Sequence, residues 1–390
     1  MILRNETKPT KSVIHHSLPM CVALIIALIS LWYLSNDSAE NRINFDELAL
    51  GTETSIYLNR ENVTQILCHD LTDAYKCIGG YNLKPRNIEE DLVLWLGNSQ
   101  LHSINQMKPA DETATVLLQK SINALGKNVL TFSQPNANLQ EHYVLLNYLI
   151  GKLPISTLVL PVVFDDMRET GIRHNIVDAF EEEDVSRRLE KTEIGKELLL
   201  TYKREDMHGN EMAASGKTSQ DSIESFLNSG LESLWPAWGE RAALRASFLY
   251  GFLYKTRNWL FNINPSSIRK MIPGRYAQNF KALSGILATA EELDMKVLLY
   301  IAPIRNDVQI PYDAVEYDIF KNKVNLISNE YDNVFYKNLE GIVPAKFWGT
   351  KPSTASGIAE EIDFMHFQAG GHEILSNAIL LHLRSIWNED

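Results

Sequence analysis

The sequence has no excess of positive charge and contains few cysteines. Its 390 residues include 37 Lys and Arg against 49 Asp and Glu, and the formal net charge is −12. A protein that binds nucleic acid needs a basic face, so we expect no nucleic-acid partner. No group of His, Cys, Asp and Glu has the spacing of metal ligands. We therefore expect no metal and no other cofactor.

The three cysteines separate into two groups. Cys21 lies within an apolar segment, whereas Cys68 and Cys77 stand nine positions apart in a mixed segment. In an oxidising compartment this pair can form a disulfide around a small loop. Two independent buried thiols are the alternative for Cys68 and Cys77.

Residues 18–34, LPMCVALIIALISLWYL, form a charge-free run of seventeen residues. Such a run is at the lower limit for a spanning helix and longer than a typical signal-peptide core. Basic residues precede it and acidic residues follow it, so the positive-inside rule places residues 1–17 in the cytoplasm. We predict a single-pass, uncleaved signal anchor in the cell (inner) membrane, with the main domain periplasmic. A cleaved signal peptide is the alternative, for which residues 34–39 offer a poor cleavage site.

The segment around Ser99 combines a strand pattern with a tight turn. Residues 92–96, LVLWL, predict a buried parallel strand, Gly97-Asn98-Ser99 breaks the run, and residues 101–107 begin a helical pattern. This order places Ser99 at the carboxyl end of a strand, with its N–H near the positive end of a helix. The geometry suits a nucleophile whose oxyanion is bound by backbone donors. Ordinary turn chemistry is the alternative.

A second motif, Asp363-Phe364-Met365-His366, lies close to the C-terminus, before Gly370-Gly371 and a final apolar helix at 374–387. An Asp three residues before a His on one loop can hold the near ring nitrogen. The far nitrogen is then free to take a proton from a serine. We expect this loop to bring Asp363 and His366 to the carboxyl edge of the sheet, beside Ser99.

The order Ser99, Asp363, His366, with the acid and the base nearly adjacent, resembles the SGNH (GDSL-type) hydrolase superfamily. The resemblance implies a three-layer parallel α/β sheet of flavodoxin-like type, with oxyanion donors from the serine N–H, a glycine of a second block and an asparagine of a third. Residues 133–140, SQPNANLQ, contain no glycine, and residues 164–168 contain no G-x-N-D motif. Asn136 and Asn138 are the tentative replacements, and a helix N-cap is their alternative role.

The rest of the chain divides into a connector and one domain. Residues 35–90 have mixed signals and are predicted to form a membrane-proximal connector. Over residues 91–390, apolar runs alternate with helical patterns, which indicates a parallel sheet covered on both faces. Residues 166–267 interrupt this alternation and are predicted to form a mainly helical insertion. Strands are expected at 92–96, 128–132, 157–164, 296–302 and near 333–336.

Within the insertion, residues 240–263 are helical in pattern and carry six aromatic and four basic side chains. A helix of this kind can lie on a membrane surface or dock a membrane partner. The alternative is a core helix or a lid over a cleft.

An anchor followed by an SGNH-like domain resembles the DltD-like proteins of teichoic-acid modification and the periplasmic proteins of polysaccharide O-acetylation. The resemblance implies a serine acyltransferase or esterase that acts on O-acyl groups of a cell-envelope polysaccharide or teichoic-acid-like polymer. It also implies a membrane-bound O-acyltransferase as partner and an acylated envelope glycan as substrate. Two alternatives stay open: a non-catalytic accessory binding protein of such a system, and a lipase-like esterase on membrane lipids.

Overall fold

The computed structural model describes residues 92–214, 266–352 and 360–388, together with residues 54–56, 67, 68, 71, 74, 77 and 78. The predicted anchor at 18–34, the aromatic helix at 240–263 and most of the predicted connector lie outside the described residues. Among the described residues, no helix is both long enough and apolar enough to cross a membrane. The chain divides into two compact units, and nearly all the described residues belong to the larger one, which comprises residues 45–210 and 262–390.

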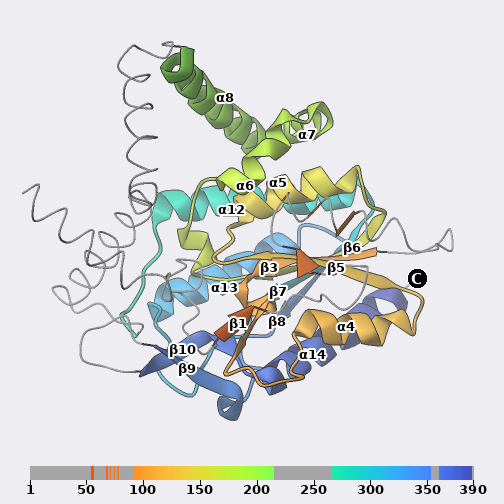
Figure 1. Cartoon of the computed structure of the whole chain (residues 1–390), viewed down its shortest axis with the longest axis vertical. Coiled ribbons are helices and arrows are strands. Elements are labelled where there is room, and N and C mark those ends of the chain that lie inside the picture. The colour runs from red at the N-terminus through yellow and green to blue at the C-terminus, as the bar shows by residue number, and fades with distance from the viewer. Residues whose placement is uncertain are drawn as a thin grey trace, which may run out of the picture. The chain divides into compact units, whose positions relative to one another are not determined.

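A six-stranded, all-parallel sheet forms the centre of this unit (Figure 1). Its strand order is β2-β5-β3-β6-β7-β8, in which the edge strand β2 is only two residues long. The predicted parallel α/β fold is thereby confirmed, and every predicted strand overlaps an observed one. The strands are β2 (Leu67–Cys68), β3 (Leu92–Asn98), β5 (Asn128–Gln134), β6 (Ile155–Val162), β7 (Lys296–Ile301) and β8 (Val334–Asn338).

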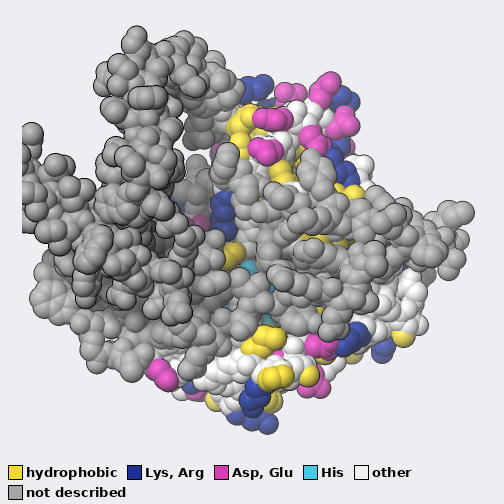
Figure 2. Space-filling model, in the orientation of Figure 1, with side chains coloured by type: hydrophobic (Ala, Val, Ile, Leu, Met, Phe, Trp, Pro, Cys, Tyr) yellow, Lys and Arg dark blue, Asp and Glu magenta, His cyan; other side chains and the backbone are white. Residues whose placement is uncertain are grey.

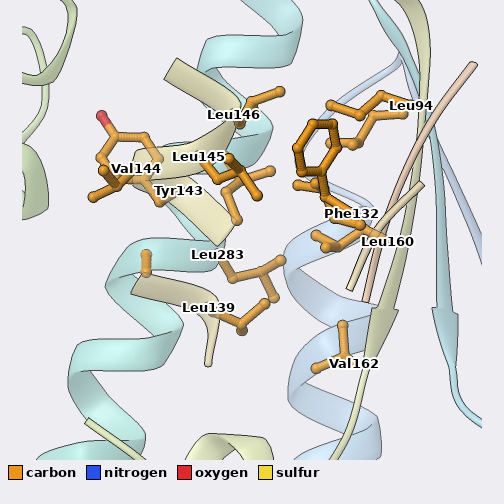
Figure 3. Packing of buried hydrophobic residues seen from close by; sticks show 14 of the residues in the cluster. Leu94, Phe132, Leu139, Tyr143, Val144, Leu145, Leu146, Leu160, Val162 and Leu283 are labelled. Atoms are coloured by element: carbon orange, nitrogen blue, oxygen red, sulfur yellow. The ribbon is translucent and has the colours of Figure 1, made fainter. Parts of the chain in front are cut away.

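Helices cover both faces of the sheet, which explains why β3 and β5 are buried along their whole length. On one face lie α5 (Leu139–Ile150), α12 (Pro273–Glu292) and α13 (Ala314–Ser328). On the other lie α4 (Ala114–Asn123) and α14 (Ala369–Asn388). Successive side chains of β3 alternate between the two hydrophobic clusters, so that Leu94 faces α5 and α12 whereas Trp95 faces α4 and α14. Figure 3 shows Leu94, Phe132 and Leu160 packed towards α5 and α12.

Two small antiparallel sheets lie beside the main one. Their strands include segments predicted from the sequence as a helix and as a loop. The first pairs β1 (Thr54–Ile56) with β4 (Ser103–Asn105), so the helix predicted at 101–107 is wrong. The chain instead makes a short 3-10 turn, η1 (Ser99–Leu101), and then a strand whose Ile104 is fully buried. The second pairs β9 (Trp348–Pro352), which follows the short turn η4 (Ala345–Phe347), with β10 (Glu360–Phe367). The predicted Asp–His loop is therefore a strand.

Between β6 and α12, most of the described residues up to 214 are helical. They form η2 (Asp166–Arg168), α6 (His174–Val177), η3 (Asp178–Glu181), α7 (Glu183–Leu189) and α8 (Glu193–Ala214). Figure 2 shows acidic and basic side chains mixed around α7. Arg187 accounts for part of this mixture, because it forms ion pairs with Glu183 at 3.0 Å and with Asp184 at 3.4 Å. These charges make a solvated helix surface.

The structure joins Cys68 to Cys77 in a disulfide, and both residues are fully buried. Cys68 lies in β2, which pairs with β5 through Leu67 and Cys68 alone. A bridge that closes a short loop beside so short a strand restricts the unfolded chain and stabilises the sheet edge.

We expect the double substitution Cys68→Ser with Cys77→Ser to lower the free energy of unfolding by about 2–3 kcal/mol, because the unfolded chain regains the freedom of the closed loop. Urea unfolding with and without reductant measures this. Reductant should shift the midpoint of the wild type towards that of the double variant and leave the double variant unchanged. Equal midpoints for the wild type and the double variant would contradict the expectation.

Candidate active site

Ser99 occupies the first position of η1, directly after β3. The preceding Gly97 has no room for a side chain, since a Cβ there would lie 2.4 Å from Leu101 Cδ1 and 3.3 Å from Pro161 Cγ. The absence of a side chain lets the chain fold back tightly on itself at this point. Asn98 then caps the turn, because its Oδ1 accepts a hydrogen bond from the Gln100 N–H at 3.0 Å.

The structure brings Ser99, His366 and Asp363 together at the edge where β3 ends. Ser99 Oγ lies 2.9 Å from His366 Nε2, although 267 positions separate the two residues in sequence. His366 Nδ1 faces Asp363 Oδ2 at 2.9 Å and Oδ1 at 3.2 Å. Since the carboxylate accepts a hydrogen bond from Nδ1–H, Nε2 is the nitrogen left to accept the proton of the serine. The three side chains thus have the contacts that a proton relay requires.

Asp363 is held as a carboxylate by the groups around it. Its Oδ1 accepts hydrogen bonds from the backbone N–H groups of Met365 at 2.9 Å and His366 at 3.0 Å. Burial alone would raise the pKa of Asp363. The charge and hydrogen bonds of His366, with a contribution from Lys351, outweigh that effect and hold its pKa well below the usual value. Asp363 therefore keeps its negative charge at neutral pH.

Asn105 is a functional residue that the sequence prediction missed. Its Nδ2 donates to Asp363 Oδ2 at 3.2 Å and to the Thr350 carbonyl at 3.1 Å, so it connects β4 to β9 and β10. Gly349 makes this possible, because a Cβ there would lie 2.0 Å from Asn105 Oδ1. The only signal in the sequence was the distance of six positions from Ser99, in a segment that was predicted to be helical.

Gln100 fastens the Ser99 turn to the distant segments that complete the site. Its Nε2 donates to the Pro303 carbonyl and to the Met365 carbonyl, each at 2.8 Å. Pro303 follows β7 and Met365 belongs to β10. Arg305 adds a further link, since its Nη1 donates to the Gly349 carbonyl of β9 at 2.9 Å. These bonds dock the β9–β10 pair onto the carboxyl edge of the main sheet.

Besides His366, the buried histidines among the described residues are His102, His142 and His372. His372 is fully buried, accepts a hydrogen bond from the Ala114 N–H at 3.1 Å and contacts the Ser103 carbonyl through Nε2 at 3.0 Å. Burial lowers the pKa of His372 to about 3, so the ring is neutral and can donate from Nε2 while accepting at Nδ1. Burial also lowers the pKa of His142, on α5, to about 3. His372 joins the start of α4 to β4 and α14.

Asn138, one of the two asparagines suggested for the oxyanion hole, is a helix N-cap in the structure. Asn138 caps α5: its Oδ1 accepts from the N–H groups of Gln140 at 2.9 Å and Glu141 at 3.1 Å. Its Nδ2 donates to the Gly171 carbonyl at 3.0 Å, and its own N–H donates to the Glu141 side chain. The Nδ2 group, which is the donor that an oxyanion would need, is thus engaged with Gly171, and Oδ1 is used in the cap. Asn136 is exposed in the turn before the helix, with a φ of 51°.

Compared with known proteins, the chain matches no protein-family model and no curated protein. The order of the parallel strands and the helices on both faces are consistent with a flavodoxin-like or SGNH-type fold. In the described part of the chain, no group of three or more His, Cys, Asp and Glu side chains could hold a metal ion. We therefore infer an active site from the contacts among Ser99, His366 and Asp363.

The ionised state of Asp363 makes stability depend on pH. Because its folded pKa lies below the unfolded value of about 3.9, its contribution is complete above that value and is lost as the pH falls. Asp363→Asn should lower the free energy of unfolding at neutral pH by about 2 kcal/mol. The gap between wild type and variant should narrow as the pH falls below about 4.

Urea unfolding at a series of pH values measures this gap. The matched control is Asp184→Asn on α7, whose carboxylate is 71% exposed, and it should change the free energy of unfolding little at any pH. A gap for Asp363→Asn that stays constant or widens as the pH falls would show that Asp363 is not held ionised in the folded protein.

Proposed function

We propose that the protein is a membrane-anchored serine acyltransferase or esterase that acts on O-acyl groups of a cell-envelope polysaccharide or teichoic-acid-like polymer. The observation that carries the proposal is the pair of contacts at His366, 2.9 Å to Ser99 Oγ on one side and 2.9 Å to Asp363 Oδ2 on the other. Covalent catalysis by a serine requires a base on the hydroxyl and a group that orients the base.

The reaction follows from these contacts in two halves. In the first, Ser99 Oγ bonds to the ester carbonyl carbon, its proton moves to His366 Nε2, and the carbonyl oxygen becomes an oxyanion. The carbon–oxygen bond of the ester then breaks, and the departing alcohol takes the proton from His366. In the second, water or an acceptor hydroxyl gives its proton to His366 Nε2 and attacks the carbonyl carbon of the acyl-serine. The bond from that carbon to Ser99 Oγ then breaks, and Ser99 Oγ takes the proton from His366. Asp363 stabilises the imidazolium that forms in each half.

The location and the partners are part of the same proposal. The predicted anchor at residues 18–34 would hold the domain at the periplasmic side of the inner membrane, near a membrane-bound O-acyltransferase. The Cys68–Cys77 disulfide supports this location, because disulfides persist in oxidising compartments and are rare in the cytoplasm. The acylated envelope glycan is the substrate that the resemblance to DltD-like proteins suggests.

One observation favours a second candidate, a non-catalytic accessory protein that binds the polymer or the acyltransferase. The chain lacks the glycine and the asparagine that supply oxyanion donors in the SGNH pattern, and the cap formed by Asn138 removes one tentative replacement. A binding protein would need a surface that fits its partner but no oxyanion donors. The lipase alternative depends on the helix predicted at 240–263, which lies outside the described residues, and it stays a sequence-based alternative.

A serine-directed fluorophosphonate distinguishes the enzyme from the binding protein. We expect it to label the wild type at Ser99, and we expect Ser99→Ala and His366→Ala to reduce the labelling rate by about 1,000-fold or more, because the nucleophile or its base is gone. Quantitative mass spectrometry of the labelled peptide measures the rate.

Ser121→Ala serves as the matched control, since Ser121 lies on α4 and its hydroxyl donates to the Leu117 carbonyl. It should be labelled as fast as the wild type. A folded wild-type protein that takes up no label would favour the accessory binding protein over the enzyme.

A further inference from the structure

Two consecutive acids after β6 have very different surroundings. Asp165 pairs with cations, through Arg168 Nη1 at 3.2 Å and through Arg269, and its Oδ2 also accepts a hydrogen bond from the Tyr312 hydroxyl at 3.1 Å. Asp166 takes part in none of the ion pairs formed among the described residues. Among the described residues, Asp165 is thus paired with arginines, whereas Asp166 has no ion-pair partner.

Asp166 is nevertheless connected to the nucleophile. Asn98 Nδ2 donates to Asp166 Oδ2 at 2.7 Å, and Asn98 Oδ1 accepts from the Gln100 N–H at 3.0 Å. Asp166 and Asn98 are 8% and 5% exposed. One continuous set of hydrogen bonds thus runs from Asp166 through the residue before Ser99 to the residue after it. Asp166 fixes the orientation of the amide that caps the Ser99 turn.

The charges around Asp166 favour its neutral form. Burial is the largest influence and raises the pKa of Asp166 well above its ordinary value, although the hydrogen bond from Asn98 acts in the opposite direction and lowers it. The negative charges of Asp165 and Glu169 raise that pKa further. Arg173 is the cation that opposes them, and its guanidinium is already paired with the buried carboxylate of Glu141 at 3.2 Å. Nothing among these neighbours compensates a negative charge on Asp166 in full.

We propose that Asp166 is an uncharged positioning residue, a carboxylic acid that orients the Ser99 turn through Asn98 and must stay protonated while Ser99 reacts. The inference rests on the proposed function, in which an oxyanion forms beside Ser99. A neutral acid can accept the Asn98 hydrogen bond without adding a second negative charge next to that oxyanion. An ionised carboxylate would accept the same bond but would repel the developing charge.

The test compares Asp166→Asn with Asp166→Ala in the full chain. Asn keeps the shape and the acceptor oxygen without an ionisable proton, whereas Ala removes the acceptor from Asn98. The readout is the rate of fluorophosphonate labelling of Ser99 as a function of pH. Labelling of the wild type should decline on the alkaline side as Asp166 ionises. Asp166→Asn should label within about threefold of the wild type at neutral pH and lack that decline.

Asp166→Ala should label about 10- to 100-fold more slowly, because the Asn98 amide loses its partner. Glu169→Gln removes a facing negative charge and keeps the size of the side chain. It should move the alkaline decline to lower pH, and it should have no such effect in the Asp166→Asn background. If Asp166→Ala does not fold, Asp166→Asn and Glu169→Gln still decide the question.

An infrared measurement reads the protonation state without any activity. At neutral pH, the wild type minus Asp166→Asn difference spectrum should contain the C=O stretch of a protonated carboxyl group. The absence of that band, a labelling profile of Asp166→Asn identical to that of the wild type, or loss of its labelling at neutral pH would each overturn the inference. A wild type that shows the band but takes up no label would refute the proposed function, and the positioning role would fall with it.

Discussion

The structure depends on one long-range contact, the hydrogen bond between the Ser99 hydroxyl and the His366 ring across 267 positions of sequence. The two residues lie in different sheets: Ser99 follows the central strand β3 of the main sheet, whereas His366 belongs to the small β9–β10 sheet. Gln100 brings the two parts together by bonding both the segment after β7 and β10. Because parallel strands present their carboxyl ends at one edge, the sheet supplies the place where such segments meet.

Two acids near Ser99 show how their surroundings shift the pKa of one residue type in opposite directions. Asp363 is almost completely buried, but two backbone N–H groups, the Asn105 amide and the His366 ring all donate to it. Asp166 is also buried, but the donor to its Oδ2 is the neutral Asn98 amide. The number and charge of the donors, rather than depth, separate the two carboxyl groups. On this account, one stabilises the imidazolium and the other adds no charge next to the oxyanion.

The sequence predicted those parts of the protein that are determined locally. A buried parallel strand is a continuous apolar run, so β3, β5, β6 and β7 were found, and the residues Ser99, Asp363 and His366 were found by their types and order. The segment at 101–107 was misread because β4 exists only through its pairing with β1, which a helical pattern cannot reveal. Asn138 was misassigned because a cap and an oxyanion donor need the same amide. Asn105 and Gln100 were missed because their partners lie more than 200 positions away.

The central claim is that Ser99 becomes acylated, and the most direct measurement is the mass of the Ser99 peptide after brief reaction with a short acetyl ester and acid quenching. The account predicts an acetyl group on Ser99 that accumulates and then disappears with time, and that does not form in Ser99→Ala. A folded wild-type protein whose Ser99 peptide stays unmodified, or which carries the acetyl group on another residue, would contradict the account.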